Sequence, residues 1–436
     1  MSAEVTVTGF GVRTAFGTGA EALRRGVFAG VPSFTPTTRF DTGPYRTPMA
    51  AAAPDGPDAV EDWALRHALA QCGAEALDMA GLRPGTEAAV LLGVAGDHTS
   101  VTRYWRAAAE SSSPTPLPDG EGEPKGPGGA DGPEAPGSAD GSNGPDVADG
   151  SYGENGTYGT TARYADAVPA HLAELLAGGL HLTGPRLTFT NACVASAAAI
   201  IHACRLISSG RIDTAVCAGG YLVEEETFGK FDSGRALSRD GMVRPFSADR
   251  TGLLLGDGVA AVVLESAEHA RRRGARPLTT IAGWGAATDA HHIAQPHPEG
   301  AGLARAARQA LRLAGDPDGA TLGYVNAHGT GTKYNDGAET RGLRAAFPER
   351  VESIPVSSTK STTGHLLEAA GVVEFVITML ALMDGVLPPT AGYGRPDPEC
   401  DLDYVPNQPR QADLRRALNI NAAFGGANTA LVLERP

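Results

Sequence analysis

The sequence has few cysteines and a shortage of positive charge, and each shortage excludes a class of protein. The five cysteines among 436 residues form no CxxC pair, so neither a disulfide framework nor a structural zinc site is expected. Lys and Arg number 36 against 50 Asp and Glu, a net charge of −14, which argues against a protein that follows nucleic-acid phosphates or an anionic membrane. We expect an intracellular protein that binds neither metal nor nucleic acid.

Long hydrophobic runs are also missing. The longest one, Phe375 to Met383, lies between Glu374 and Asp384, whereas a membrane-spanning helix needs about 20 apolar residues. The N-terminus lacks the basic-then-apolar order of a signal peptide. We therefore predict a cytoplasmic location without membrane association.

Large apolar side chains are almost absent from one segment, residues 111–159, which is acidic and rich in Gly and Pro. Such a segment cannot bury enough surface to offset the entropy that ordering it would cost. We interpret it as a disordered acidic insertion in a surface loop. A GxxxxGK[ST] phosphate loop is absent too. The GxGxxG-like glycines at Gly9–Gly11 and Gly252–Gly258 do not lie between a strand and a helix, so dinucleotide binding has little support.

The rest of the chain alternates short β-rich runs with helical patterns, which is typical of a layered α/β fold. Three stretches matter most for function. They are a strand at 187–190 followed by a helix at 194–207, strands at 324–327 and 354–357 with a helix at 369–383, and a hairpin of strands 418–421 and 429–433.

Cys193 follows the first of these strands, in Thr190-Asn-Ala-Cys193-Val-Ala-Ser. Small neighbours permit a tight turn that would expose a nucleophile at the start of a helix, where free N–H groups favour a thiolate. A cysteine in an Ala-rich helix is more often a buried small hydrophobe. The local sequence therefore makes Cys193 a candidate nucleophile but does not decide between these two interpretations.

Two histidines lie just after strands, in loops of glycine and small hydroxyl residues. His328 begins His-Gly-Thr-Gly-Thr, and His365 closes Lys360-Ser-Thr-Thr-Gly-His365. Strand ends are where α/β proteins present catalytic groups. One Cys and two His could bind zinc, but their spacing matches no metal site and a fourth ligand is missing. Nucleophilic acyl chemistry is the better interpretation.

Together these segments resemble the β-ketoacyl synthase family of the thiolase-like fold, in order and approximate spacing. The likeness runs from Val5 to Glu434, apart from the acidic insertion. The motifs that carry it are the Cys193 turn, His328-Gly-Thr-Gly-Thr with Asn335, Asp336 and Glu339, Lys360 to His365, and Asn421-Ala-Ala-Phe424-Gly425-Gly-Ala-Asn428.

The resemblance implies a five-layered αβαβα thiolase-like fold built from two similar halves. We expect an N-terminal half, residues 1–266, that carries Cys193, and a C-terminal half, residues 267–436, that carries both histidines. It also implies a 3-oxoacyl-[acyl-carrier-protein] synthase activity, in which a Cys193-bound acyl group condenses with decarboxylating malonyl. No cofactor is implied beyond the phosphopantetheine arm of an acyl carrier protein.

Roles for individual residues follow from the same resemblance. His328 and His365 would stabilise the enolate as neutral donors. Lys360 and Glu339 would support them through a polar network. The N–H groups of Cys193 and Phe424 would hold the oxyanion, and the Phe424 ring, next to Gly425, would gate the acyl pocket.

A few residues depart from the family pattern. Ala423 stands where a glycine is usual before Phe424, and Asp257 replaces a common Glu. Glu368, three residues after His365, occupies a position that is often small. A carboxylate that reached His365 would raise the pKa of its imidazole and weaken it as a neutral donor.

Partners are implied only by analogy: an acyl carrier protein, and either a homodimer or a heterodimer with a chain-length-factor-like paralogue. Because the cysteine is present and no carrier domain is attached, we expect a stand-alone catalytic subunit, with type II polyketide synthesis favoured over fatty acid elongation. A non-decarboxylating acyltransferase of the same fold and a non-catalytic scaffold remain open alternatives.

Overall fold

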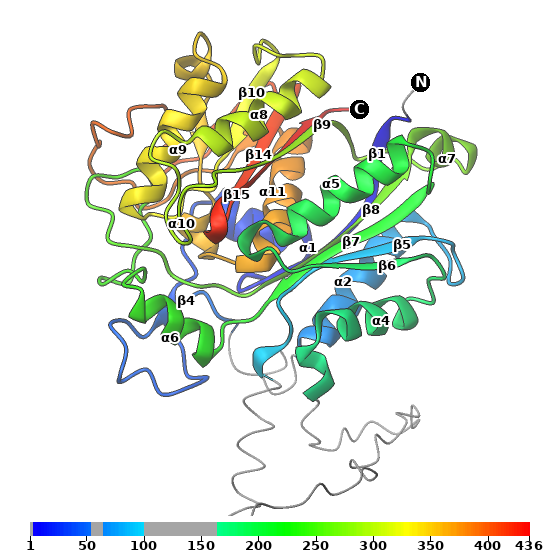
Figure 1. Cartoon of the computed structure of the whole chain (residues 1–436), viewed down its shortest axis with the longest axis horizontal. Coiled ribbons are helices and arrows are strands. Elements are labelled where there is room, and N and C mark those ends of the chain that lie inside the picture. The colour runs from blue at the N-terminus through cyan, green and yellow to red at the C-terminus, as the bar shows by residue number, and fades with distance from the viewer. Residues whose placement is uncertain (1–2, 54–63, 100–163) are drawn as a thin grey trace, which may run out of the picture.

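The computed structural model describes residues 3–53, 64–99 and 164–436 (Figure 1). The predicted acidic insertion at 111–159 lies outside the described residues. Among the helices that are described, none is both long and apolar enough to cross a bilayer. Both ends of the described chain lie on the same side of the molecule (Figure 1).

Ten of the strands form two groups of five. One group, in spatial order, is β6 (Arg186–Phe189), β5 (Ala89–Gly93), β7 (Thr214–Tyr221), β8 (Gly258–Ser266) and β1 (Val5–Thr14). The other is β11 (Val356–Ser357), β10 (Leu322–Asn326), β14 (Arg416–Ala422), β15 (Ala427–Glu434) and β9 (Thr279–Thr288). Shorter strands lie at their margins: β2 (Gly17–Thr18), β3 (Thr35–Pro36), β4 (Met49–Ala50), β12 (Val386–Leu387) and β13 (Arg410–Gln411).

The two groups are not separate sheets. β1 pairs with β9 through Val5 to Val7, opposite Thr279 to Ile281, so the hydrogen-bonded path runs without a break from β11 to β6. The predicted hairpin is confirmed: β14 and β15 pair antiparallel on either side of Phe424–Gly426.

Helices fill three layers around these strands. α2 (Leu65–Ala80) and α4 (Pro169–Gly179) cover the outer face of the first group, and α8 (Ala301–Leu313) and α9 (Lys333–Ala346) that of the second. α5 (Ala195–Ser208) and α11 (Ala370–Asp384) pack against each other between the groups (Figure 1). This is the predicted αβαβα order. The shorter helices are α1 (Gly19–Leu23), α6 (Glu225–Ser233), α7 (Ala267–Arg272) and α10 (Lys360–Thr363).

The sequence of each helix explains its layer. α11 is apolar on every side and is buried from Ala370 to Leu382, as a helix between two sheets must be. α8 keeps one apolar stripe, which faces β9 and β15. α2 approaches β1 so closely that a Cβ on Gly11 would lie 2.2 Å from the carbonyl oxygen of Cys72.

Asp257, the departure noted before β8, ties three segments together. Its buried carboxylate accepts N–H bonds from Val223 at 2.7 Å and from Ala53 at 2.8 Å. It also pairs with Arg39, whose Nη1 lies 2.7 Å from Oδ1. A charge this buried is stable only because every partner is present. Asp257 therefore acts as a structural carboxylate at this turn.

We predict that Asp257→Ala lowers the free energy of unfolding by about 3–5 kcal/mol, because it leaves the Arg39 guanidinium buried without its partner. Glu268→Ala, which breaks the exposed pair with Arg272, is the matched control and should cost less than about 1 kcal/mol. Urea unfolding of both variants measures the difference. Equal losses in the two variants would contradict a structural role for Asp257.

Candidate active site

Cys193 lies in a sharp turn between β6 and α5. The strand ends at Phe189, Ala192–Val194 forms one turn of 3-10 helix, and α5 begins at Ala195. Ala192 has φ of 54°, a left-handed conformation that costs energy in any residue with a Cβ and is a mark of functional turns. Cys193 therefore precedes α5 by two residues rather than lying in its first turn.

The structure brings both predicted histidines to this cysteine. His365 follows α10, and its Nε2 lies 3.1 Å from Cys193 Sγ. His328 follows β10, and its ring meets the His365 ring edge to face, with centroids 5.2 Å apart and planes at 84°. All three side chains are buried. Residues 135 and 37 positions apart in the chain thus form one cluster, at the ends of separate strands.

Burial sets the protonation of the cluster. It lowers the pKa of His328 and of His365 well below the ordinary value, and the nearby Lys360 charge lowers both further. Both rings are therefore neutral at physiological pH, and each can donate one N–H. Burial also raises the pKa of Cys193 to about 12, with Glu368 adding to the shift. The prediction of a thiolate at the helix start is wrong for this closed site, because desolvation outweighs the helix dipole.

Glu339 fixes the backbone that carries His328. Its two carboxylate oxygens accept the N–H groups of His328 and Gly329, each at 2.7 Å, and Asn335 donates to it from the same helix, α9, at 3.2 Å. Burial raises the pKa of Glu339 to about 7, against the effect of the two backbone donors. The predicted support role for Glu339 therefore takes a specific form: it holds the main chain of His328 in place.

Lys360 pairs with a residue that the sequence analysis did not identify. Its ammonium lies 2.5 Å from Glu374 Oε1, and the other oxygen of Glu374 accepts the Asn421 amide at 2.6 Å. Burial raises the pKa of Glu374, and Lys360 opposes that shift. A single acidic residue inside the apolar run of α11 was the available signal, because a charge there needs a partner.

Phe424 lies at the surface of this region, 53% exposed. Its ring stacks on Phe231 of α6, with centroids 5.7 Å apart, and Ile293 beside it is also exposed. We call these three residues the Phe424 patch. Gly425, at φ of 82°, donates its N–H to Ile293 O at 2.7 Å, so that N–H is engaged, and the Phe424 N–H remains the proposed oxyanion donor.

The fold and the buried Cys-His-His cluster together define a thiolase-like protein with the groups needed for acyl transfer. Residues 138–270 match the β-ketoacyl synthase N-terminal domain, and residues 278–394 match the β-ketoacyl synthase C-terminal domain. The division at 266/267 into two halves is not tested by these matches and stays a prediction.

Relatives support the same assignment. The tetracenomycin polyketide synthase ketoacyl synthase alpha subunit of Streptomyces glaucescens is 32% identical over 99% of this chain and 97% of its own. A 3-oxoacyl-[acyl-carrier-protein] synthase 2 of Vibrio harveyi is 39% identical over 62% of this chain and 67% of its own. Another relative, at 41% identity, aligns over only 65% of its own length.

A solved structure, the ishigamide ketosynthase/chain length factor, superposes with a TM-score of 0.82 at 29% identity, covering all of both chains. The chain belongs to the β-ketoacyl synthase family.

We predict that the condensation rate falls as pH falls through about 7, because protonated Glu339 can no longer accept both backbone N–H groups of the His328 loop. Glu339→Gln should lower the rate about tenfold to a hundredfold, since a charge-assisted hydrogen bond contributes about 1.5–3 kcal/mol. It should also remove this acid limb. The measurement is CO₂ release by acyl-loaded enzyme across pH; an unchanged acid limb in Glu339→Gln would count against this role.

Proposed function

We propose that this chain catalyses the decarboxylative condensation of a Cys193-bound acyl group with malonyl-acyl carrier protein, in type II polyketide synthesis. The observation that carries the proposal is the 3.1 Å contact between His365 Nε2 and Cys193 Sγ, in a cluster whose two imidazoles are neutral.

Acyl loading is the first step. Cys193 Sγ attacks the carbonyl carbon of the carrier thioester, the new C–S bond forms, and the bond to the carrier sulfur breaks. Because the Cys193 thiol has a raised pKa, its proton must leave as the sulfur attacks. The proton passes to the departing carrier sulfur, so loading needs no histidine as base, and both imidazoles keep the N–H that condensation uses.

Condensation is the second step. The bond between the malonyl carboxylate and Cα breaks, CO₂ leaves, and the electron pair becomes an enolate whose oxygen accepts N–H bonds from His328 and His365. Neutral donors suit this task, because they stabilise developing charge without protonating the carbon that must react. The enolate carbon then attacks the Cys193 thioester, and the N–H groups of Cys193 and Phe424 hold the resulting oxyanion. When the C–S bond breaks, the lengthened chain stays on the carrier and the Cys193 sulfur takes a proton from water.

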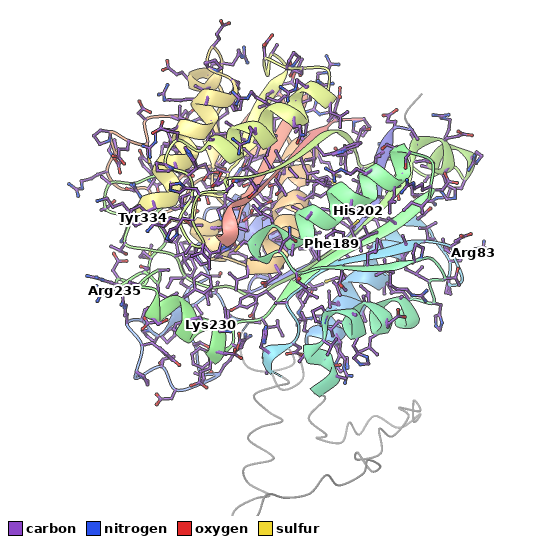
Figure 2. The ribbon with its side chains drawn as sticks, viewed as in Figure 1. Arg83, Phe189, His202, Lys230, Arg235 and Tyr334 are labelled. Carbon is purple, nitrogen blue, oxygen red and sulfur yellow. The ribbon has the colours of Figure 1, made fainter. Side chains whose placement is uncertain are left out.

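The carrier partner follows from the substrate. The Vibrio harveyi relative is named for an acyl-carrier-protein substrate, and carrier proteins reach a buried cysteine through a long flexible arm. Lys230 lies in the last turn of α6, next in sequence to Phe231 of the Phe424 patch, and pairs with Glu226 at 2.7 Å; Arg235 follows two residues after the helix ends (Figure 2). Arg235 is exposed. These cations would attract an acidic carrier to a protein that is otherwise anionic.

A second copy, or a paralogue, is proposed at β6. This strand lies at the end of the sheet path, so one side of its backbone has no neighbouring strand in the part of the chain that the structure describes. Beside it the Phe189 ring contacts the His202 ring of α5, with centroids 5.7 Å apart (Figure 2). An open strand edge invites pairing with another chain. The solved ketosynthase/chain length factor structure makes a heterodimer one form to test.

We predict that Cys193→Ala abolishes acyl loading, because no other described group near the histidines can form the thioester. His328→Ala and His365→Ala should still load but should release no CO₂, since the enolate loses a donor. Intact-protein mass spectrometry measures loading, and labelled malonyl carrier measures CO₂. Equal loading by wild type and Cys193→Ala would contradict the proposal, and loading without CO₂ release in wild type would favour a non-decarboxylating acyltransferase.

We further predict that Arg235→Glu raises the KM for an acyl carrier substrate about tenfold, because it turns an attraction near the Phe424 patch into a repulsion. The same variant should leave the KM for a free acyl-pantetheine substrate unchanged. Arg83→Glu, at a surface position on the opposite side of the molecule (Figure 2), is the matched control. A similar effect of both variants on the carrier substrate would mean that net charge, rather than this position, matters.

A further inference from the structure

A small cavity lies at the end of β7. Its volume is about 10 Å³, enough for one water-sized group. Tyr221 and Leu222 line it from the strand end. The other lining residues are Leu65, Gly96, Asp97, His98, Thr99 and Glu224. Most of the side chains are polar, so the cavity suits an oxygen-bearing group better than a hydrocarbon.

The hydroxyl of Tyr221 is a hydrogen-bond donor on the wall of this cavity. The side chain is 6% exposed, yet its hydroxyl has no hydrogen-bond partner in the structure. Buried hydroxyl groups in folded proteins almost always have one. An oxygen atom brought by a ligand into this small polar cavity would give the hydroxyl a partner.

The turn that carries Glu368 lies between the Cys193 turn and β7, the strand that ends at Tyr221. It comprises Leu367–Ala369 and packs against both. The carboxylate charge of Glu368 raises the pKa of Cys193 and contributes to the raised pKa of Tyr221. Glu368 does not contribute to the pKa of His365, which burial and the Lys360 charge lower. The sequence-based concern that Glu368 would charge His365 is therefore not realised.

We propose that Tyr221 is a specificity-determining residue: its hydroxyl donates a hydrogen bond to a keto or hydroxyl oxygen of the acyl chain held at Cys193. This rests on the proposed function and names its substrate class, acyl chains that carry oxygen along their length. A saturated chain leaves the Tyr221 hydroxyl unpaired, so it binds less well.

The test measures binding without turnover. Cys193→Ala protein is titrated with β-ketooctanoyl-pantetheine and with octanoyl-pantetheine, alone and combined with Tyr221→Phe. We expect the keto probe to bind about tenfold more tightly, a difference of about 1.4 kcal/mol, and Tyr221→Phe to remove that difference by weakening the keto probe alone. The melting temperature of the Tyr221→Phe protein should not fall, because the lost hydroxyl had no partner.

Tyr404→Phe is the matched control, since the hydroxyl of Tyr404 is buried but pairs with Thr340 at 2.7 Å. It should keep the preference for the keto probe. If Tyr221→Phe still binds the keto probe more tightly than the saturated one, the cavity holds only water and the inference is overturned. Failure of both probes to bind overturns it too. Loss of acyl loading in wild type would instead overturn the proposed function, because the binding comparison requires no reaction at Cys193.

Discussion

The burial of the catalytic cluster determines the chemistry of this protein. Cys193, His328 and His365 are buried where α5 and α11 meet between the two groups of strands. Burial keeps both imidazoles neutral and Cys193 protonated. It also makes the surrounding charges expensive unless they are paired, and the pairing is what shapes the site.

The pairing shows in how the supporting residues are used. Lys360 is neutralised by Glu374, which Asn421 completes from β14. Glu339 is held by two backbone donors, and in return it positions the His328 loop. Helices α9 and α11 and strand β14 each supply one part of this support, so the long hairpin of β14 and β15 contributes to the same site as the two histidine loops. The hydroxyl of Tyr221 has no such partner, and we propose that the acyl chain supplies one.

Much of this arrangement could be predicted from the sequence, and the reason differs from residue to residue. Cys193, His328 and His365 each follow a β-rich run, and strand ends gather at one edge of an α/β sheet. The layered fold and the hairpin around Phe424 follow from local patterns.

The ion pair of Lys360 with Glu374 could not be predicted from the sequence. No motif contains both residues, and the pair depends on how α10 and α11 pack. The joining of β1 to β9 likewise depends on long-range pairing. The protonation of Cys193 was mistaken because the helix start was visible in the sequence and the burial was not.

The central claim is that His328 and His365 act as uncharged donors. Heteronuclear NMR of the imidazole rings, followed between about pH 5.5 and 8, tests it most directly, because this range covers the ordinary titration of histidine. With His328→Ala and His365→Ala used to assign two of the 11 histidines, we expect both rings to show the neutral form throughout. Titration of both near the ordinary pKa of about 6.5 would contradict the account.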